Sequence, residues 1–167
     1  MNEIKIPGAE DRSRIAFQPP ISPTRRILVV EDDRIIRRLN AEVLMYSGYH
    51  VDAAEDGAAA WDTLQRNNYD LLLTDNDMPK VTGVELLKKL RAARMALPVI
   101  MATGTLPREE FLLYPWLQPA ATLCKPYTID QLLGTVLEVL RVTDGAREPI
   151  ARTPIREFPV SAEYWQL

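Results

Sequence analysis

The sequence predicts a single α/β domain in which helices cover both faces of a doubly wound parallel sheet. Two observations lead to this fold class. Short apolar runs alternate five times with segments of helical periodicity within about 120 residues, which is the pattern of successive βα units. The first run, 27–30, is uninterrupted and rich in β-branched residues, as is typical of a strand that is buried on both faces of a parallel sheet.

The first two strand–helix units occupy the stretch from Ile27 to about residue 66. After the strand 27–30, a helix continues until Gly48 ends it, and residues 50–54 form a second strand. Asp56 then offers an N-cap for a second helix. Apolar residues at helical spacing indicate the buried faces of the two helices: Ile36, Leu39 and Val43 in the first, and Ala60, Trp61 and Leu64 in the second.

Two further units follow. Residues 71–73 are the third strand and 83–94 the third helix, with an apolar stripe of Val84, Leu87 and Leu90. Residues 98–102 are the fourth strand. Pro107 is suited to the first position of the fourth helix, which Pro115 should end early.

The last unit contains the most clearly amphipathic helix of the chain. It follows a short fifth strand at 121–124, and Thr128 with Gln131 forms a capping box at its start. Its apolar positions are Ile129, Leu132, Leu133, Val136 and Leu140. Cys124, at the end of the fifth strand, is expected to be a buried small hydrophobe.

Prolines mark the edges of the domain, because they favour extended or irregular chain. They are concentrated before residue 25 and after residue 145. We therefore expect an N-terminal extension at 1–24, the folded domain at 25–143, and a C-terminal extension at 144–167 that holds no effector domain. Three aromatic residues of the C-terminal extension are expected to dock on a neighbouring surface: Phe158, Tyr164 and Trp165.

Composition excludes several classes of function. One cysteine and one histidine cannot supply a structural zinc site with four nitrogen or sulfur ligands. A formal net charge of -3 gives no electrostatic reason to expect nucleic acid or an anionic membrane as a partner. The sequence has neither the apolar run of a membrane span nor that of a signal peptide, so a cytoplasmic protein is the simplest interpretation.

Side chains that can bind a metal or take part in a reaction lie at the ends of four of the five strands. Acidic residues end the first and third strands, at 31–33 and at Asp75 and Asp77, whereas Thr103 and Lys125 end the fourth and fifth. Because strand ends converge at one edge of such a sheet, these carboxylates need a cation between them, and Mg²⁺ suits oxygen ligands. A lysine and a hydroxyl supply what a phosphoryl group requires. The pattern predicts a metal-assisted phosphoryl site.

Four motifs in order resemble the receiver domain of two-component response regulators, from about Arg26 to Val142. They are ILVVEDD at 27–33, YDLLLTDNDMPKVTGVELLKKLR at 69–91, MATGT at 101–105 and CKPY at 124–127. The resemblance implies a flavodoxin-like sheet of order 2-1-3-4-5. It also implies a single-domain response regulator that takes a phosphoryl group from a sensor histidine kinase or a histidine phosphotransfer protein and passes the signal to a downstream protein target.

The resemblance assigns a role to each matching position. Asp75 matches the phosphoacceptor, and Glu31 and Asp32 match the acidic pair that binds Mg²⁺ together with it. Asp77 lies where the backbone carbonyl is a further metal ligand. Thr103 and Lys125 match the switch hydroxyl and the lysine that contact phosphoryl oxygens, and the Lys125–Pro126 peptide falls where receivers have a cis bond.

The sequence departs from the family pattern in two places. Thr122 stands where the family often has an aromatic residue that moves with the hydroxyl. Pro115 interrupts the fourth helix within an aromatic-rich run of Phe111, Tyr114 and Trp116. This run either packs on the sheet or forms an output face, for example in a homodimer. Similarly, the arginines of the first helix at 34, 37 and 38 either contact a kinase or form a solvated face.

Two alternative functions remain at this point. Asp75-Asn76-Asp77 also resembles the first motif of haloacid-dehalogenase-type phosphatases, with a nucleophile and a general acid. That family places further acids late in the fold, whereas the late strands here end in Thr103 and Lys125. The second alternative is a receiver-like adaptor that binds partners without being phosphorylated.

Overall fold

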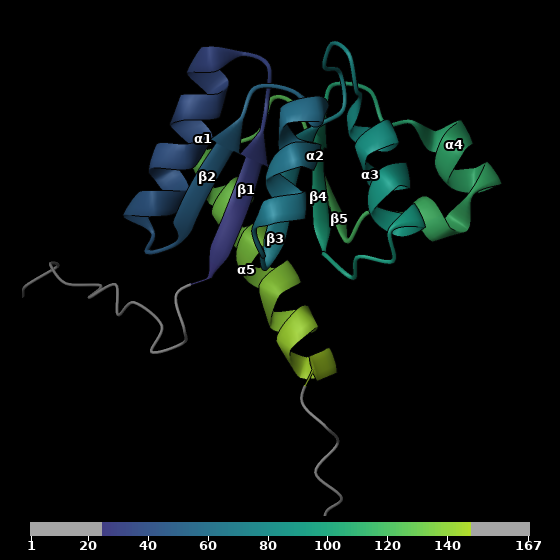
Figure 1. Cartoon of the computed structure of the whole chain (residues 1–167). Helices are drawn as coiled ribbons and strands as arrows, with labels where there is room; N and C mark the ends of the chain where they lie inside the picture. Colours follow the sequence, from purple (N-terminus) through teal and green to yellow (C-terminus); the bar gives the residue numbers. More distant parts are fainter. Residues whose placement is uncertain (1–24, 148–167) are drawn as a thin grey trace, which may run out of the picture.

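A five-stranded parallel sheet lies between two layers of helices in the computed structural model, which describes residues 25–147 (Figure 1). The predicted docking residues Phe158, Tyr164 and Trp165 lie outside the described residues. The strands are β1 (Arg26–Val30), β2 (His50–Ala54), β3 (Leu71–Asp75), β4 (Val99–Thr103) and β5 (Ala121–Cys124). The helices are α1 (Arg34–Tyr46), α2 (Gly57–Arg66), α3 (Gly83–Ala92), α4 (Arg108–Leu113), the 3₁₀ helix η1 (Pro115–Leu117) and α5 (Ile129–Arg147).

The strand order is β2-β1-β3-β4-β5, and all four neighbouring pairs are parallel, which confirms the predicted doubly wound topology. The winding reverses between β1 and β3. In open α/β sheets, ligands bind beyond the carboxyl ends of the strands at this reversal. The topology therefore directs attention to the loops that follow β1 and β3.

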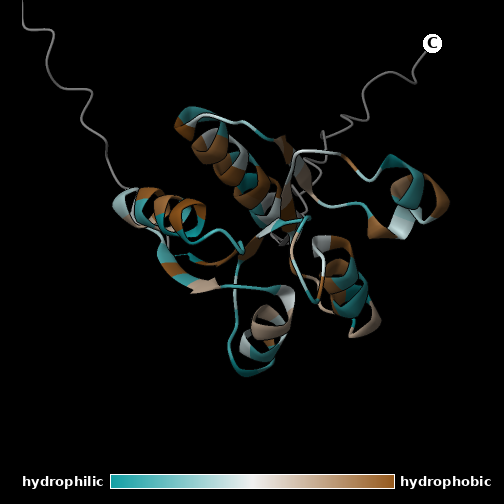
Figure 2. Cartoon of the chain, turned by 90° about the horizontal axis from the view of Figure 1, so that it is seen from above, coloured by the Kyte–Doolittle hydropathy of each residue, from teal (hydrophilic) through white to brown (hydrophobic). Residues whose placement is uncertain are grey.

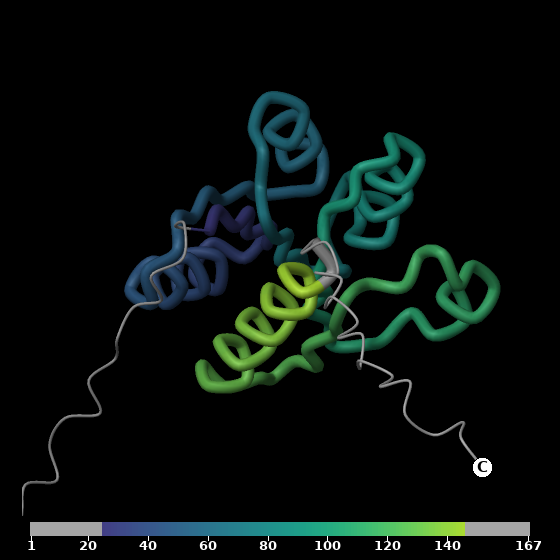
Figure 3. The backbone as a smooth tube through the Cα atoms, turned by 90° about the horizontal axis from the view of Figure 1, so that it is seen from below, coloured from purple at the N-terminus to yellow at the C-terminus, as the bar shows by residue number. Residues whose placement is uncertain are grey.

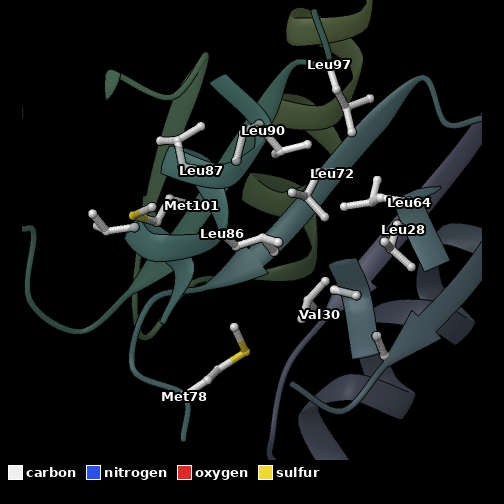
Figure 4. Close-up of a cluster of buried hydrophobic side chains, with 14 of the residues drawn as sticks. Leu28, Val30, Leu64, Leu72, Met78, Leu86, Leu87, Leu90, Leu97 and Met101 are labelled. Atoms are coloured by element: carbon white, nitrogen blue, oxygen red, sulfur yellow. The ribbon is translucent and has the colours of Figure 1, made fainter. Parts of the chain in front are cut away.

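Successive strand residues point to opposite faces, and each face has its own apolar core. Helices α1 and α5 cover one face, where Val29 and Leu73 are buried, and α2, α3 and α4 cover the other, where Leu28 and Leu72 are buried (Figure 3). Apolar and hydrophilic residues alternate along the helices, as expected for amphipathic helices on a sheet (Figure 2). Met78, from the loop after β3, lies in the core of the second face (Figure 4).

Side-chain caps fix the beginnings of the helices near the predicted site. Asp33 and Asp56 cap α1 and α2 by accepting hydrogen bonds from backbone amides of the first turn. The predicted capping box of Thr128 and Gln131 is present at α5, with distances of 2.8 and 3.2 Å. These caps set where the preceding loops end and hold them beside the strand ends.

Some expectations about the elements are wrong in detail. Leu39 of α1 is 51% exposed, because the buried stripe of α1 runs through Asn40, Ala41 and Leu44 instead. Ile129, the first residue of α5, is also 51% exposed. Cys124 is exposed, since the inward-facing residue of the edge strand β5 is Leu123. Helix α5 ends at Arg147, within the stretch expected to be the C-terminal extension, and the domain bounds themselves stay a prediction.

Candidate functional site

The register of the sheet brings Glu31 and Asp75 together. Val30, the last residue of β1, pairs with Thr74 of β3, so the next residue of each strand lies at the same level. Both carboxylates are nearly enclosed, with exposed fractions of 2% for Glu31 and 5% for Asp75. Two neighbouring buried carboxylates repel each other, and a site that keeps both needs positive charge.

Lys125, which follows β5, supplies that charge. Its Nζ donates hydrogen bonds of 2.8 Å to Glu31 Oε2 and of 2.8 Å to Asp75 Oδ2. Partial burial alone would lower the pKa of Lys125, but its bonds to Asp75 and Glu31 raise it above the usual range. Burial raises the pKa of the Glu31 carboxyl, and the charge of Asp75 adds to this effect, while Lys125 opposes it. Lys125 is therefore a permanent cation at this site.

A divalent cation fits the donor set beside Lys125. Carboxylate oxygens of Glu31, Asp32 and Asp75 lie within 4.8 Å of one another. Glu31 and Asp75 are buried, whereas Asp32 is exposed to solvent. Three hard oxygen ligands with one open side match the requirements of Mg²⁺, which keeps several of its waters when it binds to proteins. The sequence-predicted acidic pair and Asp75 are thus in one cluster.

Asp77 lies at the rim of this cluster. Its backbone amide donates to Asp75 Oδ1 at 3.2 Å, while its own carboxylate is outside the three-residue group and exposed. Asn76, between the two acids, accepts from the Val84 amide at 3.3 Å through its side-chain oxygen. The loop backbone is therefore held against the start of α3.

Gly83 allows this close approach of loop and helix. A Cβ atom at this position would lie 2.4 Å from the Asp75 carbonyl oxygen and 2.9 Å from Asn76 Cα. Only a residue without a side chain fits there. The glycine that the sequence places at the turn into α3 is thus in direct contact with the backbone of Asp75.

Thr103 ends β4 on the next strand, and its hydroxyl is engaged by its own loop. It donates to the Thr105 carbonyl at 2.7 Å, accepts from the Thr105 amide at 3.1 Å, and lies 3.5 Å from Asp77 Oδ2. Thr105, which the sequence reasoning gave no role, therefore holds the hydroxyl near the rim of the acidic cluster. Rotation about a single side-chain bond can redirect that hydroxyl.

Arg37 has a different role from either of those considered for the first helix. Its guanidinium turns back and donates to the Glu31 carbonyl at 2.6 Å and to the Asp32 carbonyl at 3.1 Å. It thereby holds the loop that carries the acidic pair. Arg38 is exposed and pairs with Glu42 at 2.7 Å on the same helix.

The aromatic run after β4 divides between core and surface. Phe111 is buried with the second-face core, whereas Tyr114 and Trp116 are 44% and 57% exposed and contact each other edge to face. Thr122 is exposed on β5. The Lys125–Pro126 peptide is cis, as predicted. Among the described residues, no helix is long and apolar enough to cross a bilayer.

Comparisons with known proteins agree with this geometry. Residues 27–137 match the model of the response regulator receiver domain. The chain is 34% identical over 131 residues to the response regulator MprA of Mycolicibacterium vanbaalenii, covering 77% of this chain and 57% of the relative. It is 33% identical over 128 residues to MprA of Mycobacterium leprae, covering 75% and 56%. The chain thus spans just over half the length of these curated relatives.

Solved structures are similar as well. A CheY-like receiver domain protein from Methanospirillum hungatei superposes with a TM-score of 0.69 at 27% identity, covering 74% of this chain and 99% of that one. The response regulator TrrA of Thermotoga maritima, solved in complex with Mg²⁺ and BeF, has a TM-score of 0.62 at 31% identity and covers 70% and 99%. The match over residues 27–137, the strand order and the acidic edge together place this chain in the receiver domain family of two-component response regulators.

Proposed function

We propose that this chain accepts a phosphoryl group on the Asp75 carboxylate and signals through the conformational change that follows. One observation carries the proposal: Asp75 lies at the winding reversal of the sheet, 2.8 Å from Lys125 and within a cluster of three carboxylates. A carboxylate is a weak nucleophile. Transfer to it therefore depends on positioning and on neutralising the charge of the transferred group.

Glu31, Asp32 and Asp75 would hold Mg²⁺ in this proposal, and the backbone carbonyl of Asp77 would be a further ligand. When bound, the cation would neutralise negative charge on the phosphoryl oxygens. Lys125 already reaches both buried acids and can move one hydrogen bond to a phosphoryl oxygen. Arg37 holds the backbone of Glu31 and Asp32 in place for this task.

The phosphoryl donor would be a phosphohistidine of a sensor kinase or phosphotransfer protein. A carboxylate oxygen of Asp75 forms a bond to phosphorus and the phosphorus–nitrogen bond breaks. The leaving nitrogen takes the electron pair, and the imidazole leaves neutral because its other ring nitrogen carries a proton in the donor. Later attack of water on phosphorus returns the carboxylate and releases inorganic phosphate. The protein is itself phosphorylated and then dephosphorylated in this cycle, so it acts as a signalling protein and not as an enzyme with a small-molecule substrate.

The switch would begin at Thr103. The acyl phosphate adds about two negative charges near this hydroxyl, which can leave its bonds to Thr105 and donate to a phosphoryl oxygen instead. That rotation releases the loop before α4 and shifts the population of its conformations. Because Thr122 has no ring, the change would reach α4 through the loop and not through an aromatic side chain on β5.

Contact with a downstream protein is the proposed output, with the receiver acting as a single-domain regulator. Supporting this, α4 and η1 expose apolar side chains: Leu112 is 79% exposed, Leu113 72% and Trp116 57%. The same surface would serve a homodimer. Sedimentation analysis of the purified protein, with and without the phosphoryl analogue beryllofluoride, separates the two cases. Only formation of a homodimer would raise the sedimenting mass when no other protein is present.

Labelling with acetyl phosphate and Mg²⁺, followed by intact-protein mass, tests phosphoryl acceptance. The parent protein should gain the mass of one phosphoryl group, Asp75→Asn should gain none, and chelation of Mg²⁺ should abolish labelling. Asp33→Asn is the matched control, because Asp33 is an acid of the same loop that only caps α1. An unlabelled parent protein would favour the phosphorylation-independent adaptor, and undiminished labelling of Asp75→Asn would refute the assignment. Catalytic release of phosphate from phosphomonoesters would instead support the phosphatase alternative, which the family match disfavours.

A further inference from the structure

The junction between β2 and α2, residues 54–57, contacts the loop that carries Glu31 and Asp32 and also the loop that follows Asp75. On one side, the Glu31 amide donates to the Ala54 carbonyl at 3.2 Å. On the other, Lys80 Nζ donates to Asp56 Oδ2 at 2.5 Å. Lys80 belongs to the β3–α3 loop, residues 76–82, which also contains Asp77. The junction therefore connects the two halves of the candidate metal site.

Asp56 carries a charge that its capping role does not require. Its Oδ1 accepts from the amides of Ala58 and Ala59 at 3.0 and 2.8 Å, and an asparagine would cap the helix equally well. Asp56 is 4% exposed, and a buried carboxylate is costly unless it is paired. Its second oxygen is paired with Lys80, and this hydrogen bond, together with those from the helix amides, lowers the pKa of Asp56. The charge of Asp56 thus serves the contact with the loop.

Lys80 is held in an unusual backbone conformation. Its φ is 66°, and the Val81 amide donates to the Pro79 carbonyl at 2.8 Å across it, which closes a γ-turn with positive φ. Such turns are rare and strained for residues with a side chain. Strained residues persist only where their surroundings hold them. The side chain of Lys80 is 66% exposed, and the contact that it makes is the ion pair with the buried Asp56, which acts together with the packing of the neighbouring residues.

The loop is fixed on either side of Lys80 as well. Met78 is buried in the core beneath α3 (Figure 4), and Val81 lies so close to Gly57 that a Cβ there would be 2.6 Å from the Val81 carbonyl oxygen. Asp77 therefore sits between two anchored points, Asp75 in β3 and Met78 in the core. Its backbone has little freedom while the β3–α3 loop stays against α2.

We propose that Lys80 and Asp56 are positioning residues for the candidate metal site: their ion pair holds the β3–α3 loop, and with it the Asp77 carbonyl, at the distance from Glu31 that a divalent cation requires. This inference rests on the proposed function. It adds two residues outside the acidic cluster that set the geometry of the cluster without touching the cation.

Lys80→Gly tests the proposal, because glycine adopts a φ of 66° without strain and removes only the side chain. We expect amide hydrogen exchange at Met78, Val81 and Gly83 to accelerate without metal. We also expect the dissociation constant for Mg²⁺, from NMR titration of the Asp77 amide, to rise about tenfold, as for other outer-shell partners. The urea midpoint should fall modestly, since relief of the strain at residue 80 offsets part of the cost of leaving Asp56 unpaired, and both readouts are therefore taken without denaturant. Lys80→Arg should restore both readouts. Arg94→Gly is the control, since Arg94 has a φ of 55° away from the site.

Asp56→Asn removes the charge and keeps the cap, so it should reproduce the effect of Lys80→Gly, and the double variant should be no worse than either single variant. Unchanged loop exchange and unchanged Mg²⁺ affinity in Lys80→Gly would overturn the proposal. So would additive losses in the double variant. If the parent protein bound no Mg²⁺, the proposed function would lose its metal, and the exchange rates without metal would still decide whether the ion pair holds the loop.

Discussion

Gly83→Ala is the substitution with the best-defined steric consequence at the candidate site. The new Cβ would lie 2.4 Å from the Asp75 carbonyl oxygen, about 1 Å inside the 3.4 Å at which ordinary contact begins. The atoms nearest to this Cβ are backbone atoms of Asp75 and Asn76, which cannot rotate away. Overpacking of this kind costs about 1–3 kcal/mol. Because the neighbouring atoms belong to the backbone and cannot move easily, we expect a loss of about 2–3 kcal/mol. For a domain of this size, that lowers the melting temperature by about 6–12 °C.

Urea denaturation measures the loss, as a lower midpoint at unchanged slope. Acetyl phosphate labelling should slow as well, because the displaced backbone belongs to Asp75, the proposed phosphoacceptor. Gly134→Ala is the matched control: a Cβ added to this glycine of α5 would meet no atom within 4 Å, so alanine should add about 0.5–1 kcal/mol of helix stability. A Gly83→Ala protein as stable as the parent would refute the reasoning.

Three further outcomes follow from the described contacts. Lys125→Met should lower the free energy of unfolding by about 2–4 kcal/mol in chelator, because it leaves two buried carboxylates unpaired, and Mg²⁺ should restore part of the loss; equal stability in chelator would contradict this. Burial, then the bond to Asp52, raises the pKa of Tyr69 to about 12. Because the unfolded tyrosine ionises first, stability should fall as the pH rises from 10 toward 12, and Asp52→Asn should lower this pKa in an absorbance titration. Asp77→Asn should weaken Mg²⁺ binding by about two- to fivefold, the effect of one exposed charge, and added salt should shrink the difference.

The strand ends were predictable because parallel topology converts order along the chain into position along one edge. Once five alternating units were recognised, Glu31, Asp75 and Lys125 had to lie at the carboxyl ends of strands of one sheet, and the structure places Lys125 within hydrogen-bonding distance of both acids. The hydrogen-bond partner of the Thr103 hydroxyl was not predictable, since a hydroxyl at a strand end can bond to the backbone of its own loop as readily as to a ligand. The role of Thr105 accordingly became visible only in the structure.

Helix faces and edge strands were predicted less well. In α1, apolar residues occur on more than one face, and the stripe through Leu39 competes with one through Leu44. The expected stripe was wrong at Leu39, whereas Val43 does pack against the core; the buried stripe includes Asn40, a polar residue whose side chain donates to the Tyr127 hydroxyl at 2.9 Å. Periodicity counts apolar residues and cannot include a buried amide whose partner lies 87 positions away. The pairing of Lys80 with Asp56 escaped prediction for the same reason.

Charge explains why the acidic cluster and Lys125 belong together. Three carboxylates and one ammonium leave the site with two negative charges, so a phosphoryl donor, itself anionic, is repelled unless a divalent cation is present. A second lysine in place of the cation would neutralise one charge only and would hold the buried acids permanently. In the proposed function, an exchangeable cation would allow the same carboxylates to meet a phosphoryl donor in one step and the transferred group in the next. If the proposal holds, the rigidity of the β3–α3 loop, which carries the Asp77 carbonyl, would matter for transfer, and a substitution at Lys80 would remove that rigidity without unfolding the sheet.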